Sequence, residues 1–364
     1  MRIGIDARKL HDGGIGTYIR ALLREYARAP GGNEFVALLS PEDAGAAAPI
    51  PGIPVRAGKY SLAEHWAVPA AARRAGVALL HAPHFTLPLF WRGPSVVTIH
   101  DLIHVRHAAL FRPGTGLAAR AIAGVAARRA RLVLTGSTHS RDEIAELLGI
   151  PAGKIRITPY GVSAGIGRRP EEAAVAFRAA RGLPSGYVLY VGARKPHKNV
   201  GVLLRALGRM KPGSRPPLVL SGPPWAPGEP LARAAGAAGI AADVRFAGPL
   251  AGDEELSLLY SGAALYAQPS KDEGFGLPPL EAMACGVPVL ASPAGALRET
   301  LGDAAVFVPP DDEAGWTAAL EALLGDPGRR AAMGERGLAH ARRFTWERTA
   351  ALTLAAYGEA MGHA

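Results

Sequence analysis

The stretch Gln268-Pro-Ser-Lys-Asp-Glu-Gly-Phe-Gly-Leu-Pro-Pro-Leu-Glu-Ala-Met-Ala-Cys-Gly286 follows a short apolar run and leads into a helix-like segment. Pro278 and Pro279 suit a first helical turn, where a missing N–H costs nothing and the fixed φ is already helical. Gly274 and Gly276 allow the backbone to approach a ligand closely. The N–H groups at the start of a helix favour an anion such as phosphate. The stretch therefore predicts a phosphate-binding turn between a strand and a helix.

Two acids flank this turn, Glu273 in the loop and Glu281 in the helix. A sugar nucleotide carries hydroxyl groups at both ends and a diphosphate between them, so an acid on each side of a helix terminus complements its layout. We place Glu281 in the first helical turn, where the helix dipole favours negative charge. Two structural alternatives stay open: Glu281 could serve the dipole alone, and the glycines could serve a tight turn.

Short apolar runs alternate with helix-length stretches on both sides of this motif, which is the pattern of parallel sheets covered by helices. In the first half the expected strands are 3–6, 35–39, 77–81, 96–100, 132–135 and 155–158. In the second half they are 187–191, 218–221, 244–247, 264–268, 287–291 and 305–308. Each half therefore predicts a doubly wound α/β sheet, which binds ligands at the carboxyl ends of its strands.

Length and composition agree with a two-domain globular protein. The chain has 364 residues, a net charge of +10 and one cysteine, Cys285, so no internal disulfide is possible and a reducing compartment is expected. No apolar run is long enough to span a bilayer, and the N-terminus lacks the features of a secretory signal, so we expect a cytoplasmic protein. The positive charge favours acidic partners such as phosphorylated ligands, nucleic acid or an anionic membrane, or else marks an arginine-rich surface without a partner.

Several common nucleotide and metal motifs are absent from the sequence. It contains no G-x-x-x-x-G-K-[ST] phosphate loop, no H-E-x-x-H and no D-x-D. We therefore expect no P-loop NTPase, no bound metal and no cofactor.

The run from Glu273 to Glu281 resembles the E-x₇-E motif of the family 4 retaining glycosyltransferases with the GT-B fold, and the continuation Ala-Met-Ala-Cys-Gly-Val-Pro-Val is similar to that family's. The resemblance covers nearly the whole chain. It implies that Glu273 contacts the donor sugar and Glu281 the nucleotide ribose. It also implies that the backbone amides of Phe275, Gly276 and Leu277 reach sugar hydroxyls or phosphate.

The same resemblance implies two facing Rossmann-like domains with a cleft between them. We predict an N-terminal acceptor-side domain over 1–165, a linker over 166–185, and a C-terminal donor-binding domain over 186–343. The family's fold further implies that the helix in 344–364 crosses back to the N-terminal domain.

Cations follow the first predicted strand of the second half. Arg194 and Lys198 would lie beside a helix N-terminus, where they could neutralise a diphosphate and the charge it gains as a leaving group. Solvated loop charges are the alternative. The resemblance implies that this pair binds the diphosphate, with Lys195 as a possible substitute for Arg194.

The first half contributes glycines and histidines. Gly14 and Gly16 could form a plain turn, and the resemblance places them against the donor phosphates or the acceptor. His100 ends a predicted strand. The resemblance implies that it contacts the sugar hydroxyls near the reacting carbon. The alternative is a structural histidine whose ring nitrogens are satisfied within the protein. His81 and His84 could face the acceptor.

The predicted site combines these assignments. The catalytic residues are His100 and Glu273, and the donor-binding residues are Gly14, Gly16, Arg194, Lys198, Phe275, Gly276, Leu277 and Glu281.

The predicted activity is transfer of a hexose from a nucleoside-diphosphate sugar to an acceptor hydroxyl, with retention implied by the family and without a metal. The opening of the chain resembles mannosyltransferases of bacterial surface polysaccharides, which favours GDP-mannose over a UDP-sugar. We expect a glycan or a lipid-linked acceptor, in polysaccharide or glycolipid assembly, and no nucleic acid.

Two other classes stay open, a sugar-nucleotide epimerase of the same architecture and a basic scaffold without enzymatic activity that binds membrane or nucleic acid. The arginines of 117–131 could contact the inner membrane peripherally, or belong to an ordinary solvated helix face.

Overall fold

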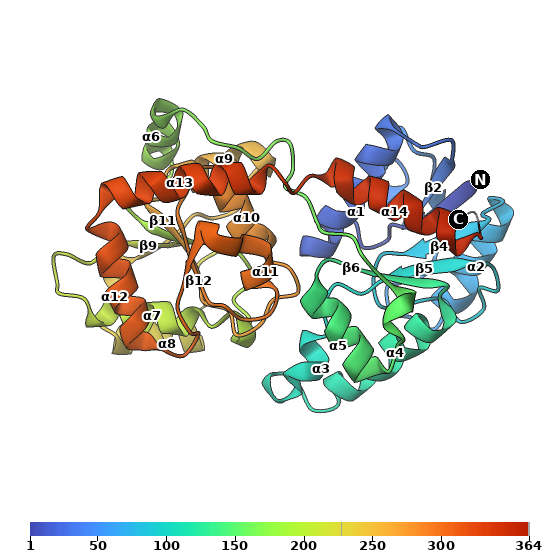
Figure 1. Cartoon of the computed structure of the whole chain (residues 1–364), viewed down its shortest axis with the longest axis horizontal. Helices are drawn as coiled ribbons and strands as arrows, with labels where there is room; N and C mark the ends of the chain where they lie inside the picture. Colours follow the sequence, from blue (N-terminus) through green and yellow to red (C-terminus); the bar gives the residue numbers. More distant parts are fainter. Residues whose placement is uncertain (227, 363–364) are drawn as a thin grey trace. The chain divides into compact units, whose positions relative to one another are not determined.

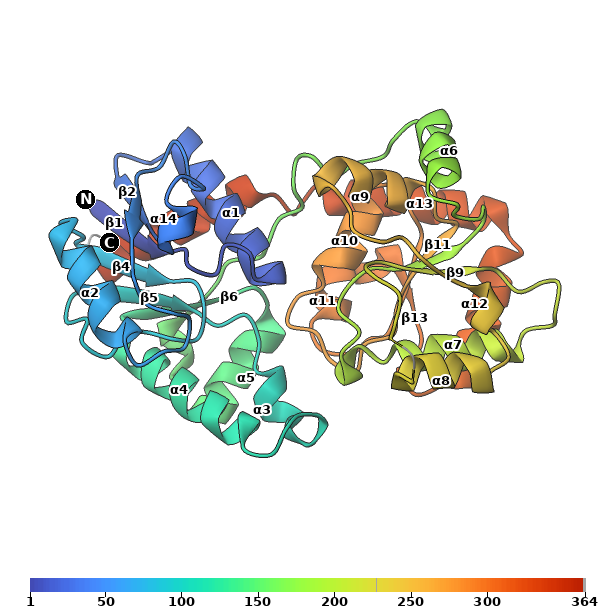
Figure 2. The same cartoon turned by 180° about the vertical axis from the view of Figure 1, so that it is seen from behind.

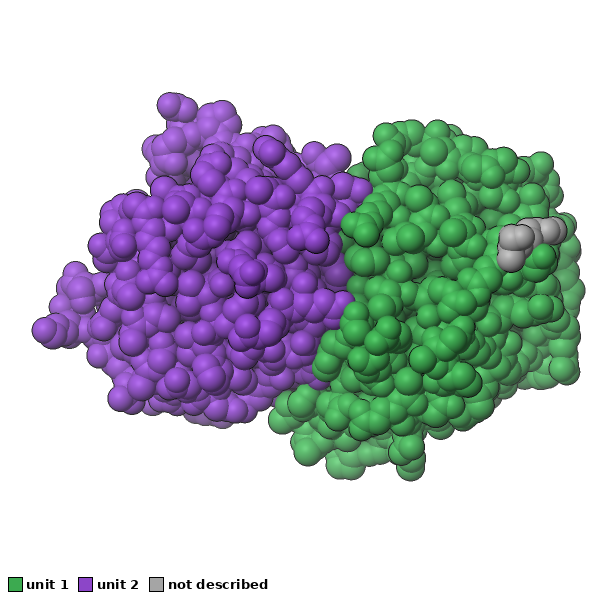
Figure 3. Space-filling model, in the orientation of Figure 1, with its two compact units in different colours: residues 1–161, 346–364 green, residues 162–345 purple. Residues whose placement is uncertain are grey.

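The structure is a computed structural model, and it describes residues 1–226 and 228–362. The chain divides into two compact units, shown in different colours in Figure 3. Unit 1 contains residues 1–161 and the C-terminal segment that begins at Trp346, and unit 2 contains residues 162–345. Each unit has its own parallel sheet with helices on both faces (Figures 1 and 2).

Unit 1 is built on a sheet of seven parallel strands in the order β3-β2-β1-β4-β5-β6-β7. The strands are β1 (Arg2–Asp6), β2 (Glu34–Leu39), β3 (Gly52–Pro54), β4 (Leu79–Ala82), β5 (Ser95–Thr98), β6 (Leu132–Thr135) and β7 (Ile155–Ile157). The helices are α1 (Gly13–Arg28), α2 (Glu64–Arg74), α3 (Ile103–Arg106), α4 (Thr115–Arg129), α5 (Thr138–Leu148) and α14 (Trp346–Ala360). Strand order reverses between β1 and β4, so this unit is doubly wound.

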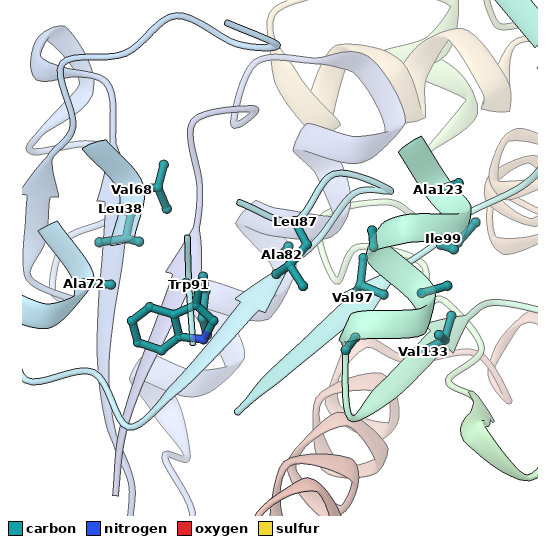
Figure 4. Packing of buried hydrophobic residues seen from close by; sticks show 14 of the residues in the cluster. Leu38, Val68, Ala72, Ala82, Leu87, Trp91, Val97, Ile99, Ala123 and Val133 are labelled. Carbon is teal, nitrogen blue, oxygen red and sulfur yellow. The ribbon is translucent and has the colours of Figure 1, made fainter. Parts of the chain in front are cut away.

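One face of this sheet packs on α2, α4 and α5. Figure 4 shows Ile99, directly after β5, close to Ala123 of α4, and Leu38 beside Val68 of α2. Alanines dominate the inner side of α4, and their small side chains let the helix lie close to the strands. Alternation along each strand sends its other side chains to the opposite face.

The opposite face packs on α1 and α14, the helix that returns from the end of the chain (Figure 1). The hydroxyl of Tyr357 in α14 hydrogen-bonds to Nδ1 of His81 at 2.7 Å and accepts from the hydroxyl of Tyr26 at 3.3 Å. His81 is fully buried, and burial lowers the pKa of His81 to about 3, so its ring is neutral. Polar contacts thus hold the C-terminal helix in the core of unit 1.

Unit 2 is built on six parallel strands in the order β10-β9-β8-β11-β12-β13. They are β8 (Val188–Tyr190), β9 (Leu218–Leu220), β10 (Val244–Phe246), β11 (Leu265–Gln268), β12 (Val289–Ala291) and β13 (Ala305–Phe307). The helices are α6 (Glu171–Ala180), α7 (Val200–Arg209), α8 (Pro230–Ala237), α9 (Gly252–Ser261), α10 (Leu277–Ala284), α11 (Leu297–Leu301), α12 (Glu313–Leu324) and α13 (Pro327–Ala341). Strand order reverses between β8 and β11.

The linker predicted over 166–185 is wrong as a separate segment. Unit 2 begins at Val162, and 166–185 belongs to it. Inside this stretch α6 packs against α9, Phe177 and Ala174 are buried, and Arg181 forms an ion pair with Glu255 at 2.6 Å. Its Gly-, Pro- and Arg-rich composition resembles a flexible connection, but the apolar side of one helix anchors it.

The ends of the predicted strands lie within two residues of the observed ones, with one omission. The short β3 was not predicted, because Gly52-Ile-Pro54 lacks an apolar run and lies at the edge of the sheet, where proline is tolerated. Among residues 1–226 and 228–362, no helix combines the length and the apolar character needed to cross a bilayer.

Candidate active site

The reversal point of the unit 2 sheet brings two predicted site residues together. Lys198 lies in a short 3₁₀ turn (Pro196–Lys198) after β8, and Glu273 lies in the loop after β11. Strands β8 and β11 are neighbours and parallel, so both loops emerge at the same edge of the sheet, on the two sides of the reversal. This is the place where doubly wound sheets bind ligands.

Glu273 is held by a set of converging donors. Nζ of Lys198 lies 2.7 Å from both of its carboxylate oxygens, and Oε1 also accepts from Nε2 of Gln268 and Oγ of Ser270, each at 2.7 Å. Its side chain is only 8% exposed and that of Lys198 21%. A buried carboxylate with this many donors stays in one position.

Backbone contacts fix the two loops to one another. Asn199 adopts φ 54°, and its side-chain amide donates to the carbonyls of Pro269 at 3.2 Å and Pro310 at 2.7 Å. The amide of Lys271 donates to the carbonyl of His197 at 2.7 Å. The Lys198–Glu273 pair is therefore set by the loops and not by the side chains alone.

Gly295 supports Glu273 from behind. Its φ is +59°, and a Cβ added there would overlap the backbone of Glu273. The amide of the next residue, Ala296, donates to the carbonyl of Glu273 at 2.9 Å. Only a glycine allows this approach, and no motif in the sequence marks Gly295.

The start of α10 differs in one respect from a simple phosphate-binding helix tip. Gly276 is the N-cap, with φ 98° in the left-handed region, and Leu277 is the first helical residue. Pro278 and Pro279 follow, and neither has an N–H to donate. The amides that this helix end can offer an anion therefore come from Gly276 and Leu277.

Glu281 is not in the first turn of α10, which contains no acid, so the predicted dipole contact is wrong. It lies one turn later, half-buried, where the hydroxyl of Tyr260 donates to Oε2 at 2.9 Å. Burial raises the pKa of Glu281 to about 7, although the hydrogen bond from Tyr260 opposes this. A carboxyl with that pKa changes its charge near neutral pH.

Arg194 and Phe275 make other contacts within unit 2. Arg194 donates to the carbonyl of Pro223 at 2.9 Å, and its guanidinium lies over the ring of Phe246 at 5.5 Å, so it is held by a different loop from Lys198. Phe275 is buried with its ring edge toward Phe344. Their roles toward a donor stay predictions.

In unit 1 the two glycines behave differently. α1 begins at Gly13, so Gly14 and Gly16 belong to its first turn rather than to a loop. Gly14 is exposed with open space around its Cα, whereas a Cβ at Gly16 would overlap the carbonyl of Leu10. Gly16 therefore has a packing reason to be glycine, and Gly14 has an exposed amide at a helix N-terminus.

His100 lies two residues beyond β5, and both of its ring nitrogens have partners within unit 1. Nε2 lies 3.0 Å from the carbonyl of Pro83, and Nδ1 lies 2.7 Å from the hydroxyl of Tyr160. A carbonyl can only accept, so Nε2 carries the proton and Nδ1 accepts from Tyr160. Burial lowers the pKa of His100. The ring is neutral and oriented, and its contact with a sugar stays a prediction.

The other two histidines of this region separate. His81 is part of the buried network with Tyr357 described above, so the hypothesis that it faces the acceptor is wrong. His84 follows β4, is also buried, and has Nε2 at 3.4 Å from the hydroxyl of Tyr60. Within the described part of the chain, its Nδ1 has no hydrogen-bond partner.

A charged cluster that is not among the predicted site residues lies beside His84, at the end of β1. Arg8 is buried and forms ion pairs with Asp6 at 2.7 Å and Glu64 at 3.3 Å. Lys9 is also buried, with Nζ 3.6 Å from the centre of the Tyr60 ring, and burial lowers the pKa of Lys9. The signal was two successive cations one residue beyond a strand, at the reversal point of the unit 1 sheet.

Two doubly wound parallel sheets, with a lysine–glutamate pair and a helix N-terminus at the reversal point of the second, define a glycosyltransferase of the GT-B class. The chain belongs to glycosyltransferase family 4: residues 12–165 match the model "Glycosyltransferase Family 4" and residues 177–340 match "Glycosyl transferases group 1". Family membership favours glycosyl transfer over the epimerase and scaffold alternatives.

Two curated relatives illustrate the similarity. The chain is 38% identical to "O-antigen chain mannosyltransferase B" of Escherichia coli over 63% of this chain and 60% of that protein. It is 34% identical to a "D-inositol 3-phosphate glycosyltransferase" of Kineococcus radiotolerans over 74% of this chain and 67% of that protein. The chain thus spans about 60% to two thirds of the length of such relatives.

Solved structures share the fold at low sequence identity. Sucrose-phosphate synthase from Thermosynechococcus elongatus superposes with a TM-score of 0.82 at 22% identity, covering 100% of both chains. HepE from Anabaena, solved in complex with UDP and glucose, superposes with a TM-score of 0.79 at 20% identity, covering 99% of this chain and 100% of that one.

Proposed function

We propose that this protein is a retaining hexosyltransferase that moves mannose from GDP-mannose to a hydroxyl of a glycan or lipid-linked acceptor, in polysaccharide or glycolipid assembly. The similarity to the Escherichia coli O-antigen mannosyltransferase supports mannose and a polysaccharide acceptor. HepE, solved with UDP and glucose, keeps a UDP-sugar as the second candidate donor. The lone Cys285 supports a cytoplasmic location.

The observation that carries the proposal is the Lys198–Glu273 pair. Lys198 forms an ion pair with the carboxylate of Glu273. A diphosphate beside Gly276 and Leu277 would offer Lys198 a second anionic partner, while Gln268 and Ser270 keep Glu273 in place to accept hydrogen bonds from sugar hydroxyls.

This arrangement addresses the charges that develop in glycosyl transfer. Breaking the bond to the anomeric carbon leaves negative charge on the diphosphate and positive charge on the sugar ring. Lys198, with the amides at the start of α10, stabilises the first, and the carboxylate of Glu273 lies ready for the second. We propose that these groups, with Arg194, act without a metal ion.

The test compares two lysines of unit 2. Lys198→Met removes the cation at the site, and Lys211→Met, at an exposed position after α7, is the control. With GDP-mannose or UDP-glucose as donor and product detected by mass spectrometry, Lys198→Met should lower kcat by about 10²- to 10³-fold. Lys211→Met should keep wild-type kcat. A folded Lys198→Met enzyme with wild-type kcat would refute the site.

Further measurements address the finer parts of the proposal. A larger thermal shift with GDP than with UDP supports the mannose donor, because a ligand that binds the native state raises its stability. Proton NMR of the product gives its anomeric configuration, and inversion would contradict retention. Activity that EDTA abolishes and a divalent cation restores would contradict the metal-independent mechanism.

A further inference from the structure

Unit 1 exposes a group of large apolar side chains outside the site described above. They come from α2, from the loop between β4 and β5, and from α4. Leu117 is 75% exposed, Trp66 57% and Ile122 45%. Side chains of this size are rarely exposed together on a soluble surface without a binding role.

These side chains form one continuous surface. A groove is lined by Tyr60 before α2, by Leu89 of the loop, and by Ile122 and Val125 of α4. Beside it, the rings of Trp66 and Phe90 lie 4.8 Å apart. We call the surface made by Tyr60, Trp66, Leu89, Phe90, Leu117, Ile122 and Val125 the apolar face.

Helix α4 extends this face along its length. Leu117, Ala121 and Val125 are spaced by four residues and therefore lie on one side of the helix. All three are exposed, and Ala121 and Val125 line the groove. The buried side of α4 is also apolar, so this helix exposes a second apolar side that packing of unit 1 does not use.

Positive charge lies beside the apolar face, where Arg73 donates to the carbonyl of Phe90 at 2.6 Å and Arg129 to the carbonyl of Leu89 at 2.7 Å. The segment 62–131 contains nine arginines, no lysine and two acids. Glu64 is buried against Arg8, and Asp101 accepts from the amide of Ile103 at 3.2 Å. All nine arginines are exposed; Arg106 pairs with glutamates of α5, and within the described residues none of the other eight forms an ion pair with an acid.

We propose that the apolar face binds the surface of a membrane that contains anionic lipids. Trp66, Tyr60 and Phe90 are residue types that favour the boundary between water and hydrocarbon, and Leu117 and Ile122 can enter it. The neighbouring arginines contact the lipid phosphates. A second copy of the chain fits this face less well, since it would bring Arg73 and Arg129 against the same two arginines of the copy.

The experiment measures co-sedimentation of the full chain with vesicles of equal parts phosphatidylcholine and phosphatidylglycerol. The wild type should bind them, bind phosphatidylcholine vesicles more weakly, and dissociate as salt rises. Leu117→Glu with Ile122→Glu should lower the partition coefficient by roughly tenfold or more, because two anions then approach an anionic surface. Arg92→Glu with Arg120→Glu should act in the same direction.

The controls place the same kinds of substitution at exposed positions outside the apolar face. Val175→Glu on α6 alters a side chain 46% exposed, close to the 45% of Ile122, and Arg336→Glu reverses an exposed charge on α13. Both should bind vesicles like the wild type. Leu117→Ser with Ile122→Ser removes apolar surface without adding charge, so it should lower vesicle binding less than the glutamate substitutions do. A graded loss of this kind separates an effect on membrane binding from a folding defect.

Wild-type vesicle binding by Leu117→Glu with Ile122→Glu would overturn the proposal, and so would an equal loss of vesicle binding in Val175→Glu. A dimer seen in light scattering that the α4 variants dissociate would also overturn it, because the apolar face would then be a contact between copies. The thermal shift with GDP or UDP is measured on the same variants. It should stay at the wild-type value, so failure of membrane binding and failure of the donor site are distinguished.

Discussion

Replacing Glu281 by Gln should stabilise the protein at neutral and alkaline pH. Glu281 is half-buried in α10, and the hydroxyl of Tyr260 donates to its carboxylate at 2.9 Å. Gln has nearly the same shape, and its carbonyl can accept from the same hydroxyl. The substitution therefore removes the charge and leaves the packing in place.

The magnitude follows from the pKa of Glu281. Burial raises it from 4.5 to about 7, so between these values the native state keeps a proton that the unfolded chain has released. The stabilisation from this carboxyl is complete below pH 4.5 and is lost as pH rises to about 7. At 1.36 kcal/mol per pKa unit, the loss is about 3 kcal/mol at most. Gln has no charge to bury, so the variant avoids this loss.

Urea unfolding of both proteins at pH 5, 6, 7 and 8 measures the effect. The difference in the free energy of unfolding should be small at pH 5 and should grow toward about 3 kcal/mol in favour of Glu281→Gln at pH 8. Glu321→Gln, at an exposed position of α12, controls for the loss of one negative charge. Because we expect Glu281 to contact the nucleotide ribose, Glu281→Gln should also show a smaller thermal shift with GDP than the wild type does.

Parallel stability curves for the wild type and Glu281→Gln across this pH range would refute the reasoning, because they would mean that Glu281 is charged at no cost in the folded protein. A variant that is less stable at every pH would show that the carboxylate has partners that a neutral amide cannot replace.

Two further substitutions test the packing around the site. Gly295→Ala should lower the free energy of unfolding, measured in urea, by at least about 2 kcal/mol, because the φ of Gly295 is +59° and the new methyl meets the backbone of Glu273. The control Gly236→Ala, at a position with open space in α8, should leave the free energy of unfolding unchanged or slightly raised. Equal changes in the free energy of unfolding for the two variants would contradict this prediction. Tyr357→Phe removes a hydroxyl bonded to His81 and should cost about 1–3 kcal/mol by thermal or urea unfolding, and no loss would mean that this buried network does not hold α14.

The regular elements could be predicted from the sequence because their determinants are local. The predicted strand 132–135 is observed as Leu132–Thr135, and the helix-length stretch that follows it forms α5. That helix has a Ser137 cap, with Ser140 N to Ser137 Oγ at 3.0 Å, and ends at Gly149 in the left-handed region. Caps, turn residues and buried apolar runs act over a few neighbours, so periodicity detects them.

The site was predicted in part. Glu273 and Lys198 lie 75 residues apart in the sequence, and each was singled out by its own motif. That they form an ion pair depends on β8 and β11 being neighbours in the sheet, which neither motif contains. Gly295 and Tyr260 had no signal, because their importance comes only from the residues packed against them.

Patterns among near neighbours in the chain were enough to predict the fold class, the position of nearly every strand and the motif that identifies the family. Only the packed structure shows which charges pair, that His81 is a buried structural residue, that 166–185 is part of unit 2, and that one apolar side of α4 is exposed. The physical reason is that burial and long-range pairing are properties of packed elements, and desolvation there changes the charge of a residue such as Glu281 without any change in its sequence neighbours.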